Sequence, residues 1–502
     1  MSCHVTFLPN DVSIDVPEGT AISDAAIKAG VSIKIPCGGN GRCGKCAVTV
    51  GHQLVLACRT PVQDGMIVTI PEDYAGKVIA ATDHRESVSD DVSPLEGRYG
   101  LAVDIGTTTV AAEIIDLRNG RTIYRSADMN LQRARGEDVL ARIQYSEEGG
   151  TSELKDLVIK TINDLISGCK EIEPSSIDVA YIAGNTAMTH LFLGVDPSPI
   201  RLPPFEPVFK EAESTGKECG LNINPCARVI CMPSVASYVG GDITSDIVDS
   251  GMDKASGLSL LIDVGTNGEV ALGDAEMMLT CSSSAGPAFE GSQMTSGMLG
   301  REGAIDSVRI DDGKLEFTVI GDAEPKGICG SGIIDLVAQL FLNGMIDGRG
   351  NFTEKAKAVD GVFTVTKGIV ITQSEIQNVI MTKAAIYSAA RTMVRSLGIE
   401  FGDLDKIYIA GGFGNFINME SAISIGLFPD TDRSKYEYLG NASLSGAKHA
   451  LMSQTFRERI DEVFPRMTYV DLGSDPVFFD EYMSAQFLPH TDDSQFPNVG
   501  QK

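Results

Sequence analysis

The chain has 502 residues, enough for about three domains. Hydrophobic residues make up 43% and charged residues 22%, as in folded globular proteins, so wholesale disorder and a fibrous protein are excluded. Its 41 Lys and Arg against 68 Asp and Glu give a net charge of −27, and such an acidic surface repels nucleic-acid phosphates and anionic lipid headgroups. We therefore expect neither nucleic acid nor a membrane as a partner.

The compartment is predicted from the N-terminus and the cysteines. The first twenty residues lack the basic start and apolar stretch of a secretory signal. No apolar run approaches the ~18 residues that suggest a membrane span. A cytoplasmic protein is expected, and since disulfides do not persist in a reducing compartment, its 11 cysteines indicate metal or redox chemistry.

The first part of the chain is predicted to be a small β-rich unit. Two short strands surround the turn residues 9–11, a helix over 23–29 ends at Gly30, and three more strands follow at 46–50, 53–58 and 65–70. Residues 72–97 are polar and lack apolar periodicity, which is typical of a flexible linker.

Four cysteines of this unit lie in one stretch of 22 residues, at Cys37, Cys43, Cys46 and Cys58. Four thiolates are what a 2Fe-2S cluster requires. The glycines among them at 38, 39, 41 and 44 suit a loop that wraps an inorganic core with its amides toward the sulfurs. A four-cysteine zinc site is the alternative, but it normally uses two Cys-x-x-Cys pairs, and only Cys43 and Cys46 form one here.

This segment resembles the β-grasp 2Fe-2S ferredoxins over about the first 75 residues. The gap of five residues between Cys37 and Cys43 is like that of the adrenodoxin type, whereas plant-type ferredoxins have a shorter gap. The resemblance implies that Cys37, Cys43, Cys46 and Cys58 hold the cluster. It also implies a domain that accepts and passes single electrons at low potential.

The second half of the chain repeats an ordered pair of motifs. A strand, a Gly/Thr turn and a strand at 101–117 return at 260–274, with Asp263 lying 159 positions after Asp104. Strands that run into glycine follow each copy, at 179–185 and 407–415. Two copies predict an internally duplicated α/β domain. Helices are expected at 152–166, capped by Ser152, and at 383–398, ended by Gly398, and the last 15 residues are expected to be frayed.

Both copies carry residues suited to phosphate. Each turn has an acidic residue at a strand end, a glycine at a tight hairpin, and hydroxyl or amide side chains, so backbone amides can hold phosphate oxygens and the carboxylate can hold Mg2+ through water. Taken alone, either turn is better explained by an ordinary hairpin with Gly and Thr in the turn. Two copies together with the glycine-rich strand end at 410–415 favour nucleotide binding. The sequence has no GxxxxGK[S/T] P-loop.

These motifs resemble the superfamily of actin, sugar kinases and heat-shock-chaperone ATPases, which has an RNase H-like fold. Such proteins bind ATP with Mg2+ in a cleft between two copies of this fold and change the cleft angle with nucleotide state. By the resemblance, the first phosphate motif comprises Asp104, Gly106, Thr107, Thr108 and Thr109. The second phosphate motif comprises Asp263, Gly265, Thr266 and Asn267. The adenosine motif comprises Gly411 and Gly412.

The order of ferredoxin domain, polar linker and actin-like ATPase resembles the reductive activators of corrinoid-dependent methyltransferase systems, over essentially the whole chain. This implies ATP-dependent one-electron reduction of a corrinoid protein from Co(II) to Co(I), an unidentified low-potential electron donor, and a homodimer. An activator of a dehydratase or radical enzyme, a redox-gated ATP-binding regulator and a small-molecule kinase remain alternatives. The domains are predicted to be 1–75 (ferredoxin-like), 76–98 (linker), 99–255 and 256–490 (the two ATPase subdomains) and 491–502 (tail).

Several other charged residues and thiols are explained without a role in binding or catalysis. Asp138 and Arg142 are expected to form an exposed i, i+4 helix pair rather than to line the nucleotide cleft, and no catalytic base is assigned. The spacing of Cys219, Cys226 and Cys231 matches no metal site, so these thiols are interpreted as buried or incidental. Cys281 and Cys329 are expected in glycine- or serine-rich turns. An approach to the nucleotide is the alternative there, but the small size of cysteine in a tight loop is a sufficient explanation. The six histidines show no HxH or HExxH spacing.

Overall fold

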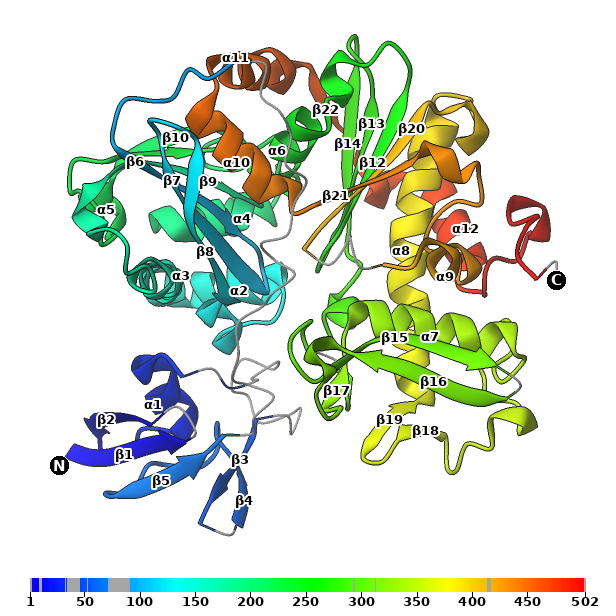
Figure 1. Cartoon of the computed structure of the whole chain (residues 1–502), viewed down its shortest axis with the longest axis horizontal. Coiled ribbons are helices and arrows are strands. Elements are labelled where there is room, and N and C mark those ends of the chain that lie inside the picture. The colour runs from blue at the N-terminus through cyan, green and yellow to red at the C-terminus, as the bar shows by residue number, and fades with distance from the viewer. Residues whose placement is uncertain are drawn as a thin grey trace. The chain divides into compact units, whose positions relative to one another are not determined.

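The computed structural model describes residues 2–8, 11–31, 33, 46–51, 53–70, 91–291, 294–311, 313–412 and 417–500. Its contacts divide the chain into two units, one formed by Met1–Val78 and Leu95–Cys231 and the other by Ile79–Pro94 and Met232–Lys502. Figure 1 labels the elements of both units. No helix in the described part of the chain is both long enough and apolar enough to cross a membrane.

The N-terminal domain of the first unit is a five-stranded sheet with one helix. The strands are ordered β2-β1-β5-β3-β4, and β1 pairs in parallel with β5, which is the arrangement of a β-grasp fold. Alternation in β1 buries Val5 and Phe7, and Gly30 ends α1 in the left-handed conformation, as predicted. The elements are β1 (Ser2–Leu8), β2 (Val12–Pro17), α1 (Ile22–Ala29), β3 (Ala47–Val50), β4 (Gln53–Leu56) and β5 (Met66–Thr69).

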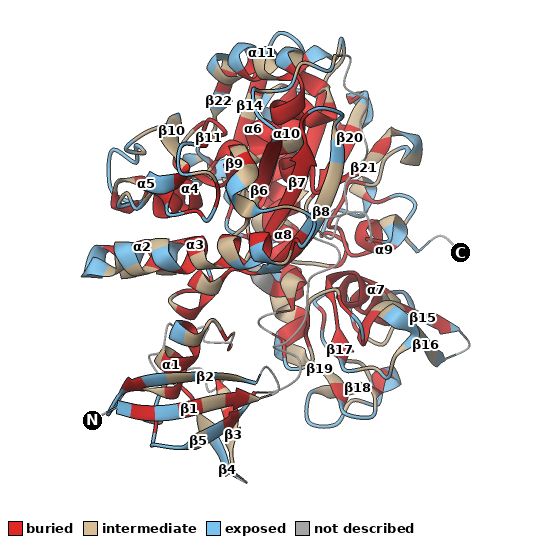
Figure 2. Cartoon of the chain, turned by 60° about the vertical axis from the view of Figure 1, so that its left-hand side comes forward, coloured by how far each residue is buried: buried red, intermediate tan, exposed pale blue. Residues whose placement is uncertain are grey.

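The rest of the first unit is a six-stranded sheet in the order β10-β11-β9-β6-β7-β8. Figure 2 shows buried residues along β6, β7 and β9, the strands that lead to the first phosphate motif. The elements are β6 (Tyr99–Ile105), β7 (Thr109–Asp116), β8 (Arg121–Met129), the 3₁₀ helix η3 (Leu131–Ala134), α2 (Val139–Tyr145), α3 (Thr151–Ser167), β9 (Ile177–Gly184), α4 (Thr186–Leu193), β10 (Ala212–Thr215), α5 (Gly216–Cys219) and β11 (Arg228–Cys231).

The second unit contains a second six-stranded sheet, in the order β21-β20-β12-β13-β14-β22. Its register repeats that of the first sheet, because Asp104 of β6 lies opposite Ala183 of β9, and Asp263 of β12 lies opposite Ala410 of β20. The predicted internal duplication is therefore confirmed. The strands are β12 (Ser259–Val264), β13 (Gly268–Gly273), β14 (Met278–Ser283), β20 (Lys406–Ala410), β21 (Tyr436–Gly440) and β22 (Met467–Tyr469).

Helices and a smaller sheet complete the second unit. The longest helix, α8, packs against β12, β13 and β14 (Figure 1). A three-stranded sheet, β16-β15-β17, and the β18-β19 hairpin form separate elements. These elements are α6 (Gly241–Ser250), β15 (Ala304–Asp311), β16 (Lys314–Val319), β17 (Gly327–Ile328), α7 (Gly330–Leu342), β18 (Val362–Thr366), β19 (Ile369–Thr372), α8 (Gln373–Ser396), α9 (Met419–Ser424), α10 (Ala442–Met452), α11 (Gln454–Val463) and α12 (Pro476–Ser484).

Three local predictions were wrong. α3 begins after Gly150 without a side-chain cap, so Ser152 is inside the helix. α8 begins ten residues before the predicted start, because Thr372 and Glu375 form a capping box there. The C-terminal residues are packed rather than frayed, since Phe496 is 3% exposed in the core of the second unit.

The predicted linker is described only in its C-terminal part, because residues 71–90 lie outside the described residues. Asp91 accepts hydrogen bonds from the hydroxyl of Ser453 and the backbone N–H of Gln454, at the start of α11. The Ser453 bond is the main cause that lowers the pKa of Asp91 to about 2. This end of the linker is therefore attached to the second unit.

Candidate functional site

Two of the four predicted cluster ligands lie together in the N-terminal domain. Cys46 directly precedes β3 and Cys58 follows β4, and the antiparallel pairing of these strands brings the two thiols to one end of the hairpin. Their sulfurs are 3.2 Å apart, too far for a disulfide bond of ~2.05 Å. Adjacent thiols are the type of ligand that a 2Fe-2S cluster requires. Cys37 and Cys43 lie outside the described residues.

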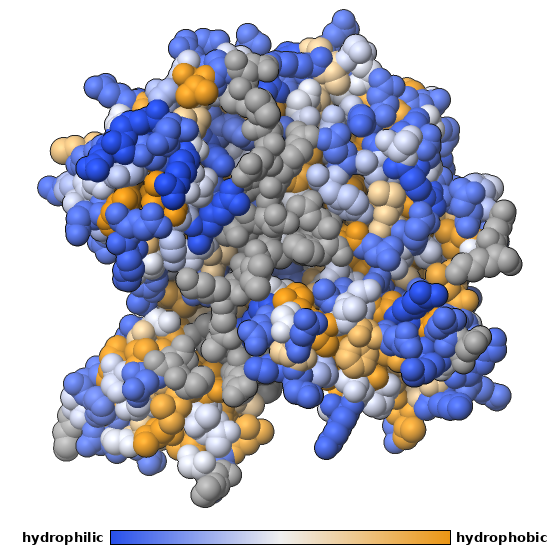
Figure 3. All heavy atoms as spheres, viewed as in Figure 1, coloured by the Kyte–Doolittle hydropathy of each residue, from blue (hydrophilic) through white to orange (hydrophobic). Residues whose placement is uncertain are grey.

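The surface of this domain carries exposed apolar side chains. Leu54 is 73% exposed and Ile67 is 54% exposed. Orange, hydrophobic spheres gather on the face of the domain that Figure 3 shows.

The first phosphate motif is held from behind by two side chains. The Asn130 side-chain amide donates to the carbonyl of Gly106 at 2.9 Å, and its backbone N–H donates to that of Thr108, also at 2.9 Å. The Arg142 guanidinium donates to the carbonyl of Thr107 between them. Because a trans peptide directs its N–H away from its C=O, the N–H groups of residues 107–109 point away from Asn130 and Arg142. Consecutive amides directed to one side are what a phosphate-binding turn needs.

Sequence reasoning missed the role of Arg142. Its side chain is fully buried, and it donates to the carbonyl of Gly136 at 2.9 Å and to Gln132 Oε1 at 3.2 Å in addition to Thr107. Asp138 instead caps α2 by accepting from the N–H of Ala141 at 2.7 Å. The expected exposed pair is therefore wrong. The sequence offered no signal, because an arginine in a short helix is normally exposed.

Asn130 and Asn185 were also missed. Asn185 caps α4 directly after β9, and its side-chain amide donates to the hydroxyl of Thr107 at 3.2 Å. Asparagine directly after a strand, at the start of a helix, is the signal that could have found it.

The second phosphate motif forms the turn between β12 and β13. The N–H of Gly265 donates to the carbonyl of Asn267 at 3.1 Å, and the Thr266 hydroxyl donates to Glu290 at 2.9 Å. Asp263 lies opposite Glu269 in the β12-β13 register. Burial raises the pKa of Glu269 well above its ordinary value, and the nearby carboxylates of Asp242 and Asp263 raise it further. The strand that follows this turn, β13, therefore holds an acidic group that favours its neutral form.

A glycine packs against each phosphate motif at the end of the neighbouring parallel strand. A Cβ atom on Gly184 would lie 2.8 Å from the carbonyl oxygen of Ile105, and one on Gly411 would lie 2.4 Å from that of Val264. Both glycines have positive φ, 152° and 109°. The same close backbone contact therefore occurs once in each half. Gly412 follows Gly411 and is half-buried, and residues 413–416 of the predicted adenosine motif lie outside the described residues.

The remaining cysteines form no metal site in the described part of the chain, where no group of three or more His, Cys, Asp or Glu is placed to hold an ion. Cys219 and Cys231 are buried, as predicted, and Cys226 is exposed. Cys281 lies in β14 rather than in a turn, and both Cys281 and Cys329 are buried. Burial raises the pKa of the Cys281 thiol and of the Cys231 thiol, so both favour the neutral form.

The β-grasp domain and the duplicated sheets define the class of protein. The chain combines a ferredoxin-like domain with a member of the actin, sugar-kinase and heat-shock-chaperone superfamily, as the sequence predicted. Three family models match it in succession. They are a 2Fe-2S iron-sulfur cluster binding domain over residues 2–72, the RACo middle region over 99–255, and the C-terminal ASKHA domain of RACo over 257–500.

Relatives match along most or all of the chain. The corrinoid activation enzyme RamQ of Eubacterium limosum is 32% identical over 96% of this chain and 98% of its own length. A reductase of Methanosarcina barkeri, described as acting on a Co(II) methylated amine-specific corrinoid protein, is 24% identical over 74% of this chain and 73% of its own. The solved structure of a reductive activator for a corrinoid, iron-sulfur protein covers 99% of this chain and 100% of its own, with 34% identity and a TM-score of 0.79. The chain belongs to this family of corrinoid-protein activators.

Proposed function

We propose that this chain reduces a corrinoid protein from Co(II) to Co(I) by one electron and uses ATP to make that reduction proceed. The observation that carries the proposal is the presence, on one polypeptide, of the paired thiols of Cys46 and Cys58 and of two matching phosphate turns at Asp104 and Asp263. Its relatives of full length, named as corrinoid activators, support it.

The proposed site residues follow the predicted motifs. Cys46 and Cys58 hold one side of the 2Fe-2S cluster, and Cys37 and Cys43 complete the four ligands. When bound, the cluster supplies a store for one electron at low potential. The amides of residues 107–109 and the turn at 265–267 hold phosphate oxygens, Asp104 and Asp263 hold Mg2+ through water, and Gly411 and Gly412 adjoin the nucleoside.

ATP is needed because the electron moves to a centre of lower potential. Each 100 mV uphill costs about 2.3 kcal/mol for one electron. ATP binding can contribute this free energy if the ATP-bound form prefers a state of the partner in which cobalt is easier to reduce. The nucleotide and the cluster therefore need not be in contact.

The domain limits are proposed as 1–75, 76–98, 99–255 and 256–490. The matched ranges of the three family models support these limits, and residues 491–500 pack on the last domain. A reducing cytoplasm suits the cysteines, since none of those described forms a disulfide. The electron donor is proposed to be a low-potential one-electron carrier, and the predicted homodimer is tested by light scattering of the purified protein.

The test is reduction of a purified Co(II) corrinoid protein under anaerobic conditions. The activator, reconstituted with iron and sulfide, is supplied with a chemical reductant and mixed with the corrinoid protein with and without MgATP. We expect the Co(I) absorbance to appear only with MgATP. Equal rates and extents without nucleotide would exclude the proposed coupling.

The same experiment separates the alternatives. A redox-gated regulator would bind the corrinoid protein and leave cobalt as Co(II). An activator of a dehydratase is disfavoured by the Cys46 and Cys58 pair, because it places cluster ligands within one separate domain of a single chain rather than between two subunits.

A further inference from the structure

Within the first unit, the helix of the 2Fe-2S domain contacts the ATPase subdomain that holds the first phosphate motif. Ile27 of α1, Ala134 of η3 and Leu157 of α3 belong to one buried apolar cluster. The core of the 2Fe-2S domain thus continues onto the surface formed by η3 and α3, which we call the docking surface.

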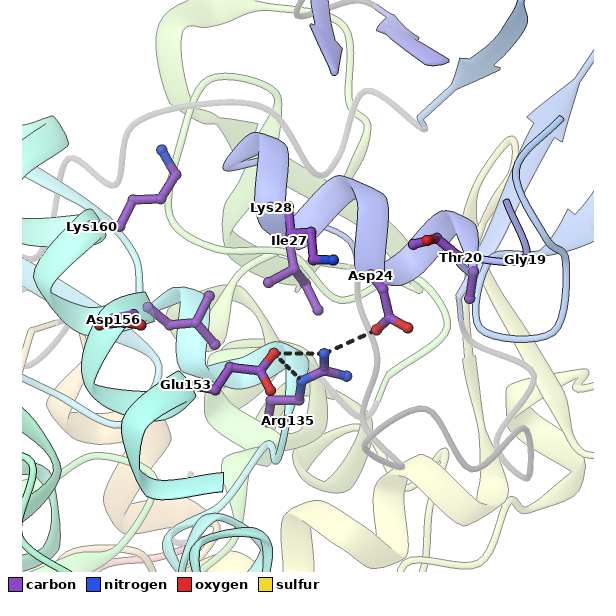
Figure 4. A pocket seen from close by; sticks show the side chains of 11 residues that line it. Gly19, Thr20, Asp24, Ile27, Lys28, Arg135, Glu153, Asp156 and Lys160 are labelled. Carbon is purple, nitrogen blue, oxygen red and sulfur yellow. Dashed lines mark hydrogen bonds and ion pairs between the residues drawn. The ribbon is translucent and has the colours of Figure 1, made fainter. Parts of the chain in front are cut away.

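Arg135 connects the two sides of this contact (Figure 4). Its guanidinium donates to Glu153 on α3 at 2.6 and 2.9 Å and lies 5.5 Å from the ring centre of Tyr145. The same guanidinium forms an ion pair of 3.0 Å with Asp24 of α1. Since Glu153 and Tyr145 fix its position from the ATPase side, Arg135 presents a preformed partner to the 2Fe-2S domain.

The contact is small and partly open. A pocket of about 640 Å³ lies between α1 and the docking surface, and it is lined by Asp24 and Arg135 and by further charged side chains, among them Lys28, Lys160 and Asp156. The apolar part of the contact is limited to the few residues of the shared cluster. Small contacts with polar surroundings are typical of transient association.

A short chain of hydrogen bonds leads from Arg135 to the first phosphate motif. The backbone N–H of Arg135 donates to the carbonyl of Gln132 at 2.9 Å. The side-chain oxygen of Gln132 accepts from Asn130 and from Arg142, both at 3.2 Å. Asn130 and Arg142 are the two residues that hold the carbonyls of residues 106–108.

Phosphate binding is expected to strengthen this chain of hydrogen bonds. An anion that accepts hydrogen bonds from the N–H groups of residues 107–109 would polarise those peptide units, and their carbonyls would then become better acceptors for Asn130 and Arg142. The segment 130–136 would thereby be held in the conformation that presents Arg135 and Ala134. A bound nucleotide and a docked 2Fe-2S domain stabilise the same conformation, so each is expected to favour the other.

We propose that nucleotide bound at the first phosphate motif favours docking of the 2Fe-2S domain on the η3–α3 surface, through Asn130, Gln132 and Arg142, with Arg135 and Asp24 as the docking pair. This proposal rests on the proposed nucleotide site. It adds that the position of the 2Fe-2S domain depends on the nucleotide state of the ATPase subdomain.

The test combines hydrogen–deuterium exchange with nucleotide affinity in the full-length, cluster-loaded protein, using the non-hydrolysable analogue AMP-PNP with Mg2+. In the wild type, we expect AMP-PNP to slow exchange in α1 and in the first half of α3. In Asp24→Lys, which places a positive charge against Arg135, this slowing should disappear and the affinity for AMP-PNP should fall at least about fivefold. Arg135→Gln, which leaves α1 unchanged, should act in the same way.

The controls separate docking from general damage. Asp24→Glu retains the carboxylate and should behave as the wild type. Asp15→Lys makes the same charge change in the same domain, in β2 and outside the pocket, and should retain the nucleotide-dependent slowing. Iron content, measured for every variant, reports an intact 2Fe-2S domain.

Two results would overturn the proposal. They are AMP-PNP binding without any change in α1 exchange, and an Asp24→Lys protein that keeps both the slowing and the affinity. If AMP-PNP does not bind the wild type at all, the proposed function itself fails. A protein that reduces cobalt with ATP and yet shows no slowing in α1 would keep the function and lose this inference.

Discussion

A Cβ atom placed on Gly411 would lie 2.4 Å from the carbonyl oxygen of Val264, the residue that follows Asp263 in the second phosphate motif. The same atom would lie 2.8 Å from the Asp263 carboxylate. Gly184 stands in the same relation to Ile105, which follows Asp104, at 2.8 Å. In both halves, the end of the parallel strand can approach the acidic turn because the residue there has no side chain.

Gly411→Ala is therefore expected to weaken nucleotide binding strongly. The added methyl group must displace the backbone at Val264 or the carboxylate of Asp263, and the φ of 109° is unfavourable for alanine. We expect the affinity for AMP-PNP, measured by calorimetry, to fall at least about tenfold, equivalent to about 1.4 kcal/mol. Gly398→Ala is the matched control, because Gly398 also has positive φ, 70°, and has nothing within 4 Å of an added Cβ. Equal affinities for the two variants would contradict the steric argument.

Replacement of Arg142 should affect both stability and nucleotide binding. Arg142→Ala removes the donor to Thr107 and leaves buried acceptors unsatisfied, which costs on the order of 3 kcal/mol and lowers the thermal unfolding midpoint by several degrees. Arg142→Lys keeps the charge but cannot reach three acceptors at once, so we expect a smaller loss of stability with a clear loss of AMP-PNP affinity.

Arg228→Ala is the control for Arg142. Arg228 forms an exposed pair with Glu213, 56% and 50% exposed, and its loss should change the stability by less than about 1 kcal/mol. An Arg142→Lys protein with wild-type affinity would show that Arg142 supports the fold and not the phosphate motif.

Removal of a predicted cluster ligand should abolish the iron signal. Cys58→Ala leaves three of the four thiolates, and we expect iron and acid-labile sulfide per chain to fall several-fold after anaerobic reconstitution. Cys3→Ala serves as the control, since Cys3 is buried in the same domain and is not part of the predicted ligand set. If Cys58→Ala retained the full ferredoxin-like spectrum, Cys58 would not be a ligand.

The pKa of Glu269 leads to a prediction about pH. Burial raises this pKa in the folded protein, so the folded state favours the protonated form more than the unfolded state does. The corresponding stability is fully present below the ordinary glutamate pKa and is lost as the pH rises through the raised value. Glu269→Gln stays neutral at every pH and still offers an oxygen to the hydroxyl of Ser282.

We therefore expect Glu269→Gln to be more stable than the wild type at pH 8 and the difference to shrink toward pH 4. Urea unfolding of the nucleotide-free proteins, followed across this range, measures the difference. A difference that did not change with pH would show that Glu269 remains charged in the folded protein.

Much of the fold could be predicted from the sequence because its signals are local. The alternation in β1, the stop at Gly30 and the two acidic turns after apolar strands each arise from residues close in the chain. Repetition of the Asp104 motif at Asp263 predicted the duplicated sheet, and family resemblance added the order of the domains.

Other features depended on contacts between distant residues and could not be predicted in this way. Ser152 resembled a helix cap, but the chain enters α3 through Gly150. The C-terminal residues were expected to be a frayed tail because they are polar. Phe496 nevertheless packs in the core of the second unit, where its ring contacts that of Tyr387 in α8.

By itself, the sequence determined which residue types stand at the two phosphate turns and in the thiol cluster, because turn geometry and metal ligation require particular side chains at short spacings. Only the tertiary structure decided that Asn130 and Arg142 support the first turn and that Arg135 meets Asp24. The physical reason is that a buried arginine is stable only where distant carbonyls surround it, and no local pattern records those carbonyls.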